Sequence, residues 1–309
     1  MTTQELSGAL PEATTSGRPA WFRRSDAWQG YLFIAPFLLV YCVFLVYPLF
    51  KGFWISLHDW ELVGTYREFI GFLNYEDLWY DSLFWKSLWN TIRFVALTVP
   101  SMTLLALLLA LAVSKRTRTH AVLRAVFFGS SVFSVSVVTF IWQMMLNGER
   151  GMLAHIFEAL GLVPIDYLRD SFWAMPSLVV TTLWWGVGLP LALFVAALQQ
   201  IPEELYEAAE LDHASRWTVL WRITLPSIRR TIVLVLVLQI VAHFQIFGQP
   251  LLMTRGGPAD STRSLVQLIY DTGFRDWQIG YAASMAIVLF AIMLVVSMIQ
   301  LFLGREERS

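Results

Sequence analysis

Long uncharged stretches dominate the pattern of hydrophobic and polar positions along the chain. Six runs contain no Asp, Glu, Lys or Arg, at 27–50, 94–114, 125–148, 171–202, 231–254 and 277–304. Each run exceeds the roughly 18 to 20 residues that a helix needs to cross about 30 Å of hydrocarbon. The pattern predicts an all-α integral membrane protein with six transmembrane helices, at about 28–50, 92–114, 125–146, 174–199, 230–250 and 279–303.

Composition supports a membrane protein over a soluble one. Of the 309 residues 57% are hydrophobic and 15% are charged, and the mean hydropathy is +0.58. Buried helices of a large soluble enzyme are the alternative, but such helices seldom run so long without a charge. The net charge of -1 gives no sign of a nucleic-acid partner, and the one cysteine, Cys42, excludes an intramolecular disulfide.

The polar ends of the chain are expected to lie outside the membrane domain. Residues 1–26 are rich in Thr, Ser, Gly and Ala and predict a disordered tail, and 305–309 form a second short tail. The first apolar run is longer than the core of a signal peptide, so it is expected to be retained as a helix. No internal repeat or linker divides 27–304, which predicts one membrane domain.

Lys and Arg residues near the span ends indicate the orientation, because basic loops are translocated poorly. With the N-terminus inside, the inner segments hold Arg18, Arg23, Arg24, Lys115, Arg116, Arg118, Arg124, Arg216, Arg222, Arg229, Arg230, Arg305 and Arg308. The longer outer loops hold only Arg67, Lys86, Arg150, Arg169, Arg255, Arg263 and Arg275. This bias predicts that both termini and the polar loop 201–228 are cytoplasmic.

The loop 201–228 reads as two short helices joined by a turn. Pro202 with the acidic residues after it favours a helix that runs to about Leu211, and Ser215 can cap a second helix. Pro226 is expected to end that second helix and to start the fifth span. Its apolar residues recur at helical spacing, at Trp217, Leu220, Trp221 and Thr224.

A small surface in the first of these helices suits contact with another protein. Ala208 and Ala209 permit a close backbone approach, and the carboxylate of Glu207 beside them can pair with a basic group. The alternative is a solvated amphipathic connector, and this short pattern alone does not decide between the two.

The chain resembles the binding-protein-dependent ABC importer permeases, and the resemblance runs from about residue 28 to 303. The loop matches their cytoplasmic motif with Glu207-Ala208-Ala209, Asp212, Ala214, Ser215 and Ile223-Thr224-Leu225-Pro226. The segments 70–94, 140–153, 186–209 and 256–286 are similar to the carbohydrate-uptake branch, and the six spans with Tyr47-Pro48 are similar to the first permease of the maltose and glycerol-phosphate systems.

The resemblance implies the type I importer fold with a cytoplasmic coupling helix, in a bacterial inner membrane. It implies a second permease subunit, two ATP-binding subunits that hold ATP and Mg, and a soluble solute-binding protein, with no cofactor on this chain. The residues that it assigns to ATPase coupling are Glu207, Ala208, Ala209, Asp212, His213, Ala214, Leu225 and Pro226. The family has glycine where this chain has His213, and histidine enters the left-handed region only at a cost, so a remodelled turn is expected there.

The spans offer neutral groups for a sugar or similar solute. Amides and hydroxyls bind sugar hydroxyls, and flat rings pack against their C–H faces. The candidates are Trp142, Gln143, Trp184, Trp185, Gln239, His243, Gln245 and Gln249, with Gln239 and His243 on one helical face and Gln245 and Gln249 on another. Gly186, Gly188 and Pro190 interrupt the fourth span and form a candidate hinge.

Other function classes fit the sequence less well. The apolar cores carry no acidic residue, which disfavours an ion-coupled secondary transporter, because coupling needs a group that binds a proton or a cation. No metal-ligand pattern, catalytic pattern or P-loop occurs, so an intramembrane enzyme and an ATPase are both disfavoured. An ABC permease for a polyol phosphate, an amino acid or phosphate remains the closest alternative.

Overall fold

The computed structural model describes the backbone of residues 20–64 and 67–305, and the side chains of residues 31–64 and 67–300. By its internal contacts the chain forms two compact units, Met1–Gly52 and Phe53–Ser309. Of the expected tails, residues 1–19 and 306–309 lie outside the described residues, whereas residues 20–26 belong to the helix α1, so the expected disorder is wrong for that stretch. The first predicted span belongs to the first unit, and the other five belong to the second.

One long apolar helix makes up the described part of the first unit. It comprises α1 (Ala20–Tyr41), the wider turn η1 (Cys42–Val46) and α2 (Tyr47–Ser56), which continues into the second unit. The stretch Tyr31–Ser56 has the length and hydropathy of a membrane span. Most of its apolar side chains are exposed, as expected for a helix that is hydrophobic all round and contacts lipid or other proteins.

The second unit begins with a small hairpin, so the all-α prediction needs correction. β1 (His58–Trp60) pairs antiparallel with β2 (Arg67–Phe69), and His58 lies opposite Phe69. α3 (Leu73–Tyr80) follows, and the Asn74 amide donates to the Ser56 and His58 carbonyl oxygens at 2.8 and 3.1 Å. The fold is otherwise mostly helical.

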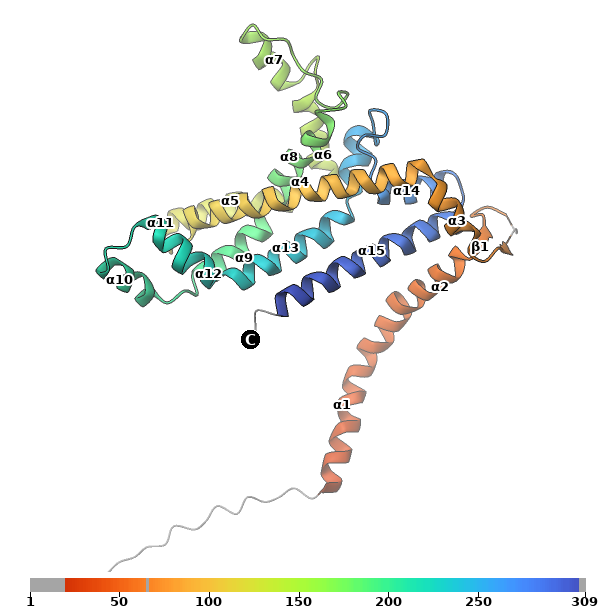
Figure 1. The fold of residues 1–309 in the computed structure, drawn as a ribbon, viewed down its shortest axis with the longest axis horizontal. Coiled ribbons are helices and arrows are strands. Elements are labelled where there is room, and N and C mark those ends of the chain that lie inside the picture. The colour runs from red at the N-terminus through yellow and green to blue at the C-terminus, as the bar shows by residue number, and fades with distance from the viewer. Residues whose placement is uncertain (1–19, 65–66, 306–309) are drawn as a thin grey trace, which may run out of the picture. The chain divides into compact units, whose positions relative to one another are not determined.

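The helix α4 (Ser82–Val113) is the central element of the second unit. It begins ten residues before the predicted start of the second span because Asp81 caps it, accepting from the Leu83 and Phe84 amides at 2.8 and 3.2 Å. α4 packs mainly against α9 (Gly188–Leu198) and α13 (Arg229–Phe244), and α15 (Ile279–Arg305) lies along α13 (Figure 1). α15 agrees with the predicted sixth span.

The third span is broken rather than straight. α5 (Arg118–Gly129) and the short turn η2 (Ser130–Val132) meet α6 (Val135–Leu146) at 98°. Serine hydroxyls form hydrogen bonds at the break. Ser131 donates to the carbonyl oxygen of Trp185 in the fourth span at 2.9 Å, and Ser134 caps α6 by accepting from the Val137 amide. The short helix α7 (Met152–Ala159) follows and leads back to the fourth span.

The fourth span bends where the sequence predicted a hinge. α8 (Ala174–Gly186) and α9 meet at 50° around Val187. A Cβ on Gly188 would lie 2.6 Å from the Ser131 hydroxyl and 3.0 Å from the Phe128 Cα, so glycine permits the close approach of α9 to the end of α5. Pro190 is buried one turn later.

The remaining elements lie at the two ends of the second unit (Figure 1). α10 (Glu203–Leu211), α11 (Arg216–Val219), η3 (Leu220–Thr224) and α12 (Leu225–Ser227) lie where α4 ends. At the end where α4 begins, η4 (Pro250–Thr254), α14 (Leu265–Tyr270) and η5 (Asp271–Arg275) follow α13. Among the described residues, three single helices have the length and hydropathy of spans, and three bent pairs raise the number to six if each pair is one span.

Candidate functional site

The helix α10 forms as the acidic start of its sequence predicts. Pro202 precedes it in an extended conformation and Glu203 and Glu204 occupy its first turn, where carboxylates stabilise the positive end of the helix dipole. Glu207 and Ala208 are exposed, whereas Ala209 is buried against its own chain. The predicted two-alanine surface therefore reduces to Ala208 beside Glu207, and Ala209 packs inward.

The turn after α10 keeps the geometry that glycine would give. His213 has φ of +52°, in the left-handed region, and the Ala214 amide donates to the Ala209 carbonyl oxygen at 2.9 Å. The His213 amide donates to the Glu210 carbonyl oxygen at 3.0 Å, which completes a Schellman motif after Asp212. The expected remodelling of this turn is not seen, since histidine adopts the left-handed conformation at a cost of about 1–2 kcal/mol.

The second helix of the loop starts at the predicted cap and ends at Ser227, one residue after the predicted end at Pro226. The Ser215 hydroxyl accepts from the Thr218 amide at 3.1 Å, so Ser215 is the N-cap. The chain then stays helical through Pro226, and the helix bends by 65° into α13 at Ile228. Proline is tolerated because the wider turn η3 precedes it, where the Leu225 amide donates to the Leu220 carbonyl oxygen five residues back.

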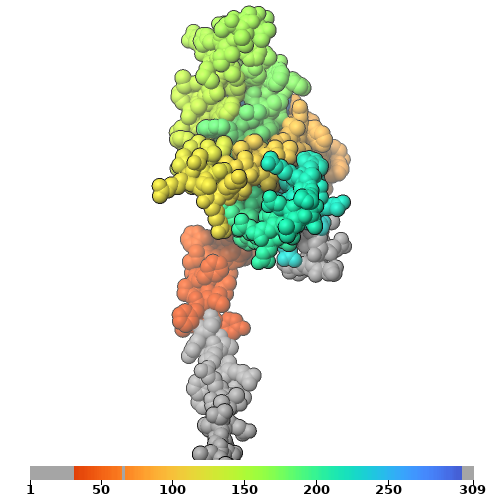
Figure 2. All heavy atoms as spheres, turned by 90° about the vertical axis from the view of Figure 1, so that its left-hand side faces the viewer, coloured from red at the N-terminus to blue at the C-terminus, as the bar shows by residue number. Residues whose placement is uncertain are grey.

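Side-chain contacts hold the two loop helices together and attach them to the bundle. The Tyr206 hydroxyl of α10 lies 3.3 Å from the Thr224 hydroxyl of η3, and Thr224 is buried. Ile228 at the bend is buried in the same core cluster as α4 and α9. Figure 2 views this end of the second unit, where the teal atoms of the loop helices form a broad exposed surface.

A cavity of about 520 Å³ lies between α8, the start of α9 and the chain after α13. Four of the predicted pathway residues line it: Trp185, His243, Gln245 and Gln249. The Trp185 Nε1 donates to the Phe133 carbonyl oxygen at 2.9 Å, which fixes the ring at the cavity wall. The Gln249 amide reaches the Thr182 hydroxyl at 3.4 Å, so one polar pair also belongs to the wall.

The other four pathway candidates do not line this cavity. Trp142 and Trp184 pack edge to face with ring centroids 6.0 Å apart, and Gln143 donates to the Leu252 carbonyl oxygen at 2.6 Å. Gln239 is buried within α13. Because α13 ends at Phe244, Gln245 and Gln249 do not share the helical face that the sequence predicted.

Sequence reasoning missed two hydroxyl residues of the cavity, Ser131 and Thr182. Thr182 lies on α8 one turn before Gly186, and Ser131 lies at the break of the third span. A hydroxyl residue beside a helix break within an apolar run is the sequence signal that could have identified them. Irregular backbone in a membrane span borders a cavity or another helix.

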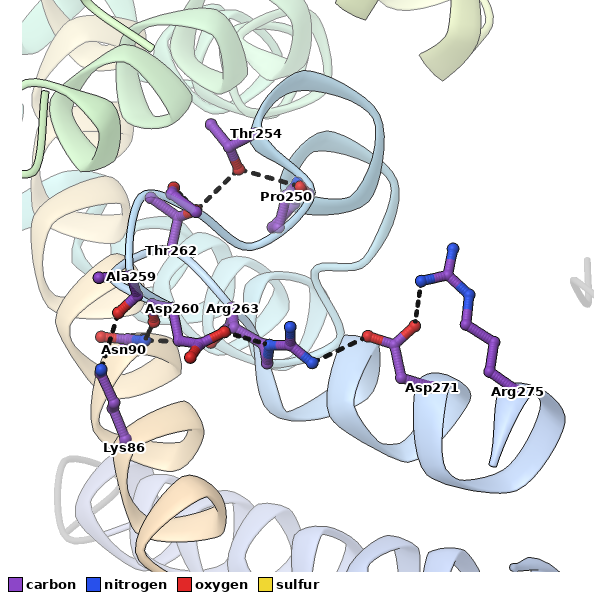
Figure 3. Close-up of polar contacts among 11 residues, drawn as sticks. Lys86, Asn90, Pro250, Thr254, Ala259, Asp260, Thr262, Arg263, Asp271 and Arg275 are labelled. Atoms are coloured by element: carbon purple, nitrogen blue, oxygen red, sulfur yellow. Dashed lines mark hydrogen bonds and ion pairs between the residues drawn. The ribbon is translucent and has the colours of Figure 1, made fainter. Parts of the chain in front are cut away.

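A polar network at the opposite end of the second unit holds the loop 255–264 (Figure 3). The Lys86 ammonium donates to the Ala259 carbonyl oxygen at 2.7 Å, and the Asn90 amide donates to the Asp260 carbonyl oxygen at 2.7 Å. The Arg263 guanidinium donates to Asp260 at 2.9 Å and to Asp271 at 3.1 Å, and Arg275 forms an ion pair with the other oxygen of Asp271 at 3.0 Å (Figure 3). We call this set the loop brace: Lys86, Asn90, Asp260, Arg263, Asp271 and Arg275.

The loop brace was not predicted, although its charged residues stand out in a predicted outer loop. The loop itself has several left-handed residues, with φ of +53° at Arg255, +83° at Gly256 and +58° at Asp260. Such backbone persists only when surrounding contacts hold it, and the brace supplies these contacts. Across the described residues no group of three His, Cys, Asp or Glu side chains could hold a metal ion.

Comparison with known proteins assigns the class of this chain. Residues 82–309 match the family described as binding-protein-dependent transport system inner membrane component. The chain therefore belongs to this family of membrane permease subunits, and the predicted resemblance is confirmed.

Individual relatives cover nearly the whole chain. It is 31% identical to the lactose transport system permease protein LacF of Rhizobium radiobacter, over 96% of this chain and 100% of that protein. It is also 31% identical to the trehalose/maltose transport system permease protein MalF of Thermococcus litoralis, over 92% and 96%. The prediction of an ABC importer permease is confirmed by these relatives.

Solved structures show the same fold. A chain of a bacterial alginate ABC transporter, solved in complex with an alginate pentasaccharide-bound periplasmic protein, superimposes with a TM-score of 0.82. The match covers 94% of this chain and 98% of that chain at 20% sequence identity. The fold of an ABC transporter permease is thus established for this chain.

Proposed function

We propose that this chain is the membrane-spanning permease subunit of an ATP-driven importer that carries a sugar or sugar-like solute. Two relatives over almost the full length are named for the transport of lactose and of trehalose and maltose. The solute arrives on a soluble binding protein, and the neighbouring alginate transporter was solved with such a periplasmic protein. A polyol phosphate remains the alternative cargo, because a relative is named for sn-glycerol-3-phosphate transport.

The observation that carries this proposal is the helix α10, which exposes Glu207 and Ala208 at the end of the second unit. Glu207 and Ala208 offer a small acidic surface, and the turn at Asp212, His213 and Ala214 closes it with a fixed geometry. We assign α10 as the coupling helix, which docks in a groove of an ATPase subunit. Leu225 and Pro226 lie in α12, directly before the bend at Ile228 that leads into α13. A partner with a basic residue in that groove would pair with the Glu207 carboxylate.

The assembly has five kinds of component in this proposal: this chain, a second permease, two ATP-binding subunits, the binding protein and the lipid bilayer. ATP and Mg are held by the ATP-binding subunits, so this chain carries no cofactor and no ATPase site of its own. Basic residues gather at the α10 end, on α5, α11 and α13, which supports a cytoplasmic location for that end and for both termini.

The cavity beside α8 is our candidate for the part of the pathway that this chain contributes. Its polar groups are amides, hydroxyls and one imidazole, and the fixed ring of Trp185 offers a flat face for sugar C–H groups. In alternating access, closure of the ATPases would move α10 and the bundle as rigid bodies. The angle between α8 and α9 at Val187 and the angle between α12 and α13 at Ile228 would change in this movement.

A charge reversal in α10 tests the proposal. In the importer reconstituted with its ATPase subunits and binding protein, Glu207→Lys should abolish the ATP hydrolysis that the solute-loaded binding protein stimulates, because two like charges would meet in the groove. Glu207→Asp is the matched control, since it keeps the carboxylate and should retain most of the stimulation. Full stimulation in a correctly inserted Glu207→Lys complex would refute the coupling role of α10.

A further inference from the structure

Two tryptophans form an exposed aromatic surface on the helix made of α11, η3 and α12. The side chains of Trp217 and Trp221 are 69% and 56% exposed, and their rings stack edge to face at 5.8 Å between centroids. The two positions are one turn apart, so both rings project on the same side of the helix. We call this surface the tryptophan face.

Arginines flank the tryptophan face on both sides. Arg216 precedes Trp217 and Arg222 follows Trp221 in the chain, and because successive residues of a helix point in different directions, the two arginines project to opposite sides of the two rings. Both arginines are exposed, and within the described part of the chain neither forms an ion pair. No acidic residue occurs in the chain between Asp212 and Asp260, so the helix itself and the start of α13 carry only basic charges, and the acidic residues nearby belong to α10.

The bend at Ile228 keeps this helix close to the membrane surface. The uncharged run of the fifth span starts directly after Arg230, which places the start of α13 at the edge of the hydrocarbon. Trp221 precedes Ile228 by seven residues, about 10 Å of helix at a rise of about 1.5 Å per residue. With the 65° bend and α13 along the membrane normal, the Trp221 backbone lies only about 4 Å beyond Ile228 along the normal.

That depth falls within the headgroup layer, which is roughly 5–8 Å thick on each side of the hydrocarbon core. Tryptophan rings favour this layer, where the indole contacts acyl chains and its N–H stays hydrated. Arginine side chains there reach outward to phosphate, which accepts two parallel bonds from one guanidinium. The arrangement of an aromatic face between basic borders is typical of a helix that lies in the membrane interface.

We infer that the helix Arg216–Ser227 is an interfacial anchor that binds anionic phospholipid. Trp217 and Trp221 lie among the headgroups, and Arg216 and Arg222 bind their phosphates. The inference goes beyond the proposed transport function and takes from it only that the chain spans a membrane. A lipid is favoured over soluble phosphate because the two exposed rings would contribute nothing to binding a free anion, whereas they add apolar contact area to a lipid.

Site-specific photocrosslinking tests the anchor. The photoreactive residue benzoylphenylalanine replaces Trp217 or Trp221 in the full importer, held in nanodiscs of phosphatidylethanolamine and phosphatidylglycerol. We expect phospholipid adducts at both positions by mass spectrometry. Adducts only with protein subunits, or no more lipid adduct than at the control position, would overturn the inference.

The control position is Leu211, which is 82% exposed at the end of α10 in the same loop. Benzoylphenylalanine there should crosslink to an ATPase subunit if the proposed function is right. Failure of the proposed function would therefore appear as a missing ATPase adduct at position 211, whereas failure of the anchor would appear as missing lipid adducts at positions 217 and 221. The two failures are distinguishable in one set of samples.

A second measurement tests the arginines. Arg222→Gln should lower the phosphatidylglycerol that stays bound after detergent extraction by about fivefold, as expected for the loss of one basic residue near an anionic surface. Arg150→Gln is the matched control, since Arg150 is an exposed arginine in the loop before α7. An equal loss in both variants, or no loss in Arg222→Gln, would contradict the role of Arg222.

Discussion

Arg263 is the residue on which the loop brace depends most, and its replacement gives a quantitative test of the structure. The guanidinium bonds two carboxylates from different places in the chain, Asp260 at 2.9 Å and Asp271 at 3.1 Å. The Arg263 side chain is 22% exposed and that of Asp271 is 9% exposed, so this pair is poorly screened by water. Arg263→Ala removes both bonds at once.

The expected cost follows from the exposure of each partner. The bond to Asp260 contributes less than about 1 kcal/mol because that carboxylate is 37% exposed. The bond to the buried Asp271 contributes about 1.5–3 kcal/mol, the range for hydrogen bonds to charged groups. Arg275 still neutralises Asp271, which keeps the total near 2 kcal/mol rather than the roughly 3–5 kcal/mol of a fully orphaned buried charge.

Thermal unfolding in detergent, followed by intrinsic fluorescence, measures this cost. A loss of about 2 kcal/mol lowers the Tm by roughly 4–8 °C for a domain of this size class. Arg275→Ala is the matched control: it removes a guanidinium from the same carboxylate, but its side chain is 60% exposed, so the expected shift is less than half as large. Equal Tm values for the two variants would refute the argument that burial sets the strength of the brace.

Three further predictions follow from particular contacts. Gly280→Ala should disrupt the packing of α15 against β1, because the added Cβ would clash with the His58 carbonyl oxygen. Loss of the monodisperse peak in size-exclusion chromatography measures this disruption. His213→Gly should raise the stability by about 1 kcal/mol by relieving the left-handed backbone, and an unchanged or lower Tm would contradict it. Trp185→Ala should slow solute uptake about tenfold, because the loss of the ring contact with the solute costs roughly 1.4 kcal/mol. ATP hydrolysis in the absence of the binding protein should be unchanged. Uptake at the normal rate would show that Trp185 does not line the pathway.

Features set by local sequence were predictable. α10 ends at Leu211 and the next helix is capped by Ser215, because an acidic first turn and a serine cap act within a few residues. The predicted sixth span, 279–303, also agrees with α15 to within two residues at each end. The uncharged run between Asp276 and Arg305 is only slightly longer than the helix, so its bounds fix the helix ends closely.

Features that depend on distant contacts were not predictable from the pattern. At the 98° break of the third span, Ser131 donates to the carbonyl oxygen of Trp185, 54 residues away. The end of α13 at Phe244 separates Gln245 from the helical face on which the sequence placed it. The loop brace joins Lys86 and Asn90 to a loop about 170 residues later, and no spacing rule relates those positions.

The same geometry explains how a movement of α10 could reach the cavity. α10 contacts η3 through Tyr206 and Thr224, the helix continues through Pro226 to the buried Ile228, and α13 then runs 16 residues, about 24 Å, to Phe244. The next residues, Gln245 to Gln249, line the cavity. The loop brace ties the segment that follows the cavity residues to α4, so a movement of α13 would shift one side of the cavity wall relative to a loop that is held in place. In the proposed function, a displacement of α10 that reaches α13 would change the shape of the cavity, as alternating access requires.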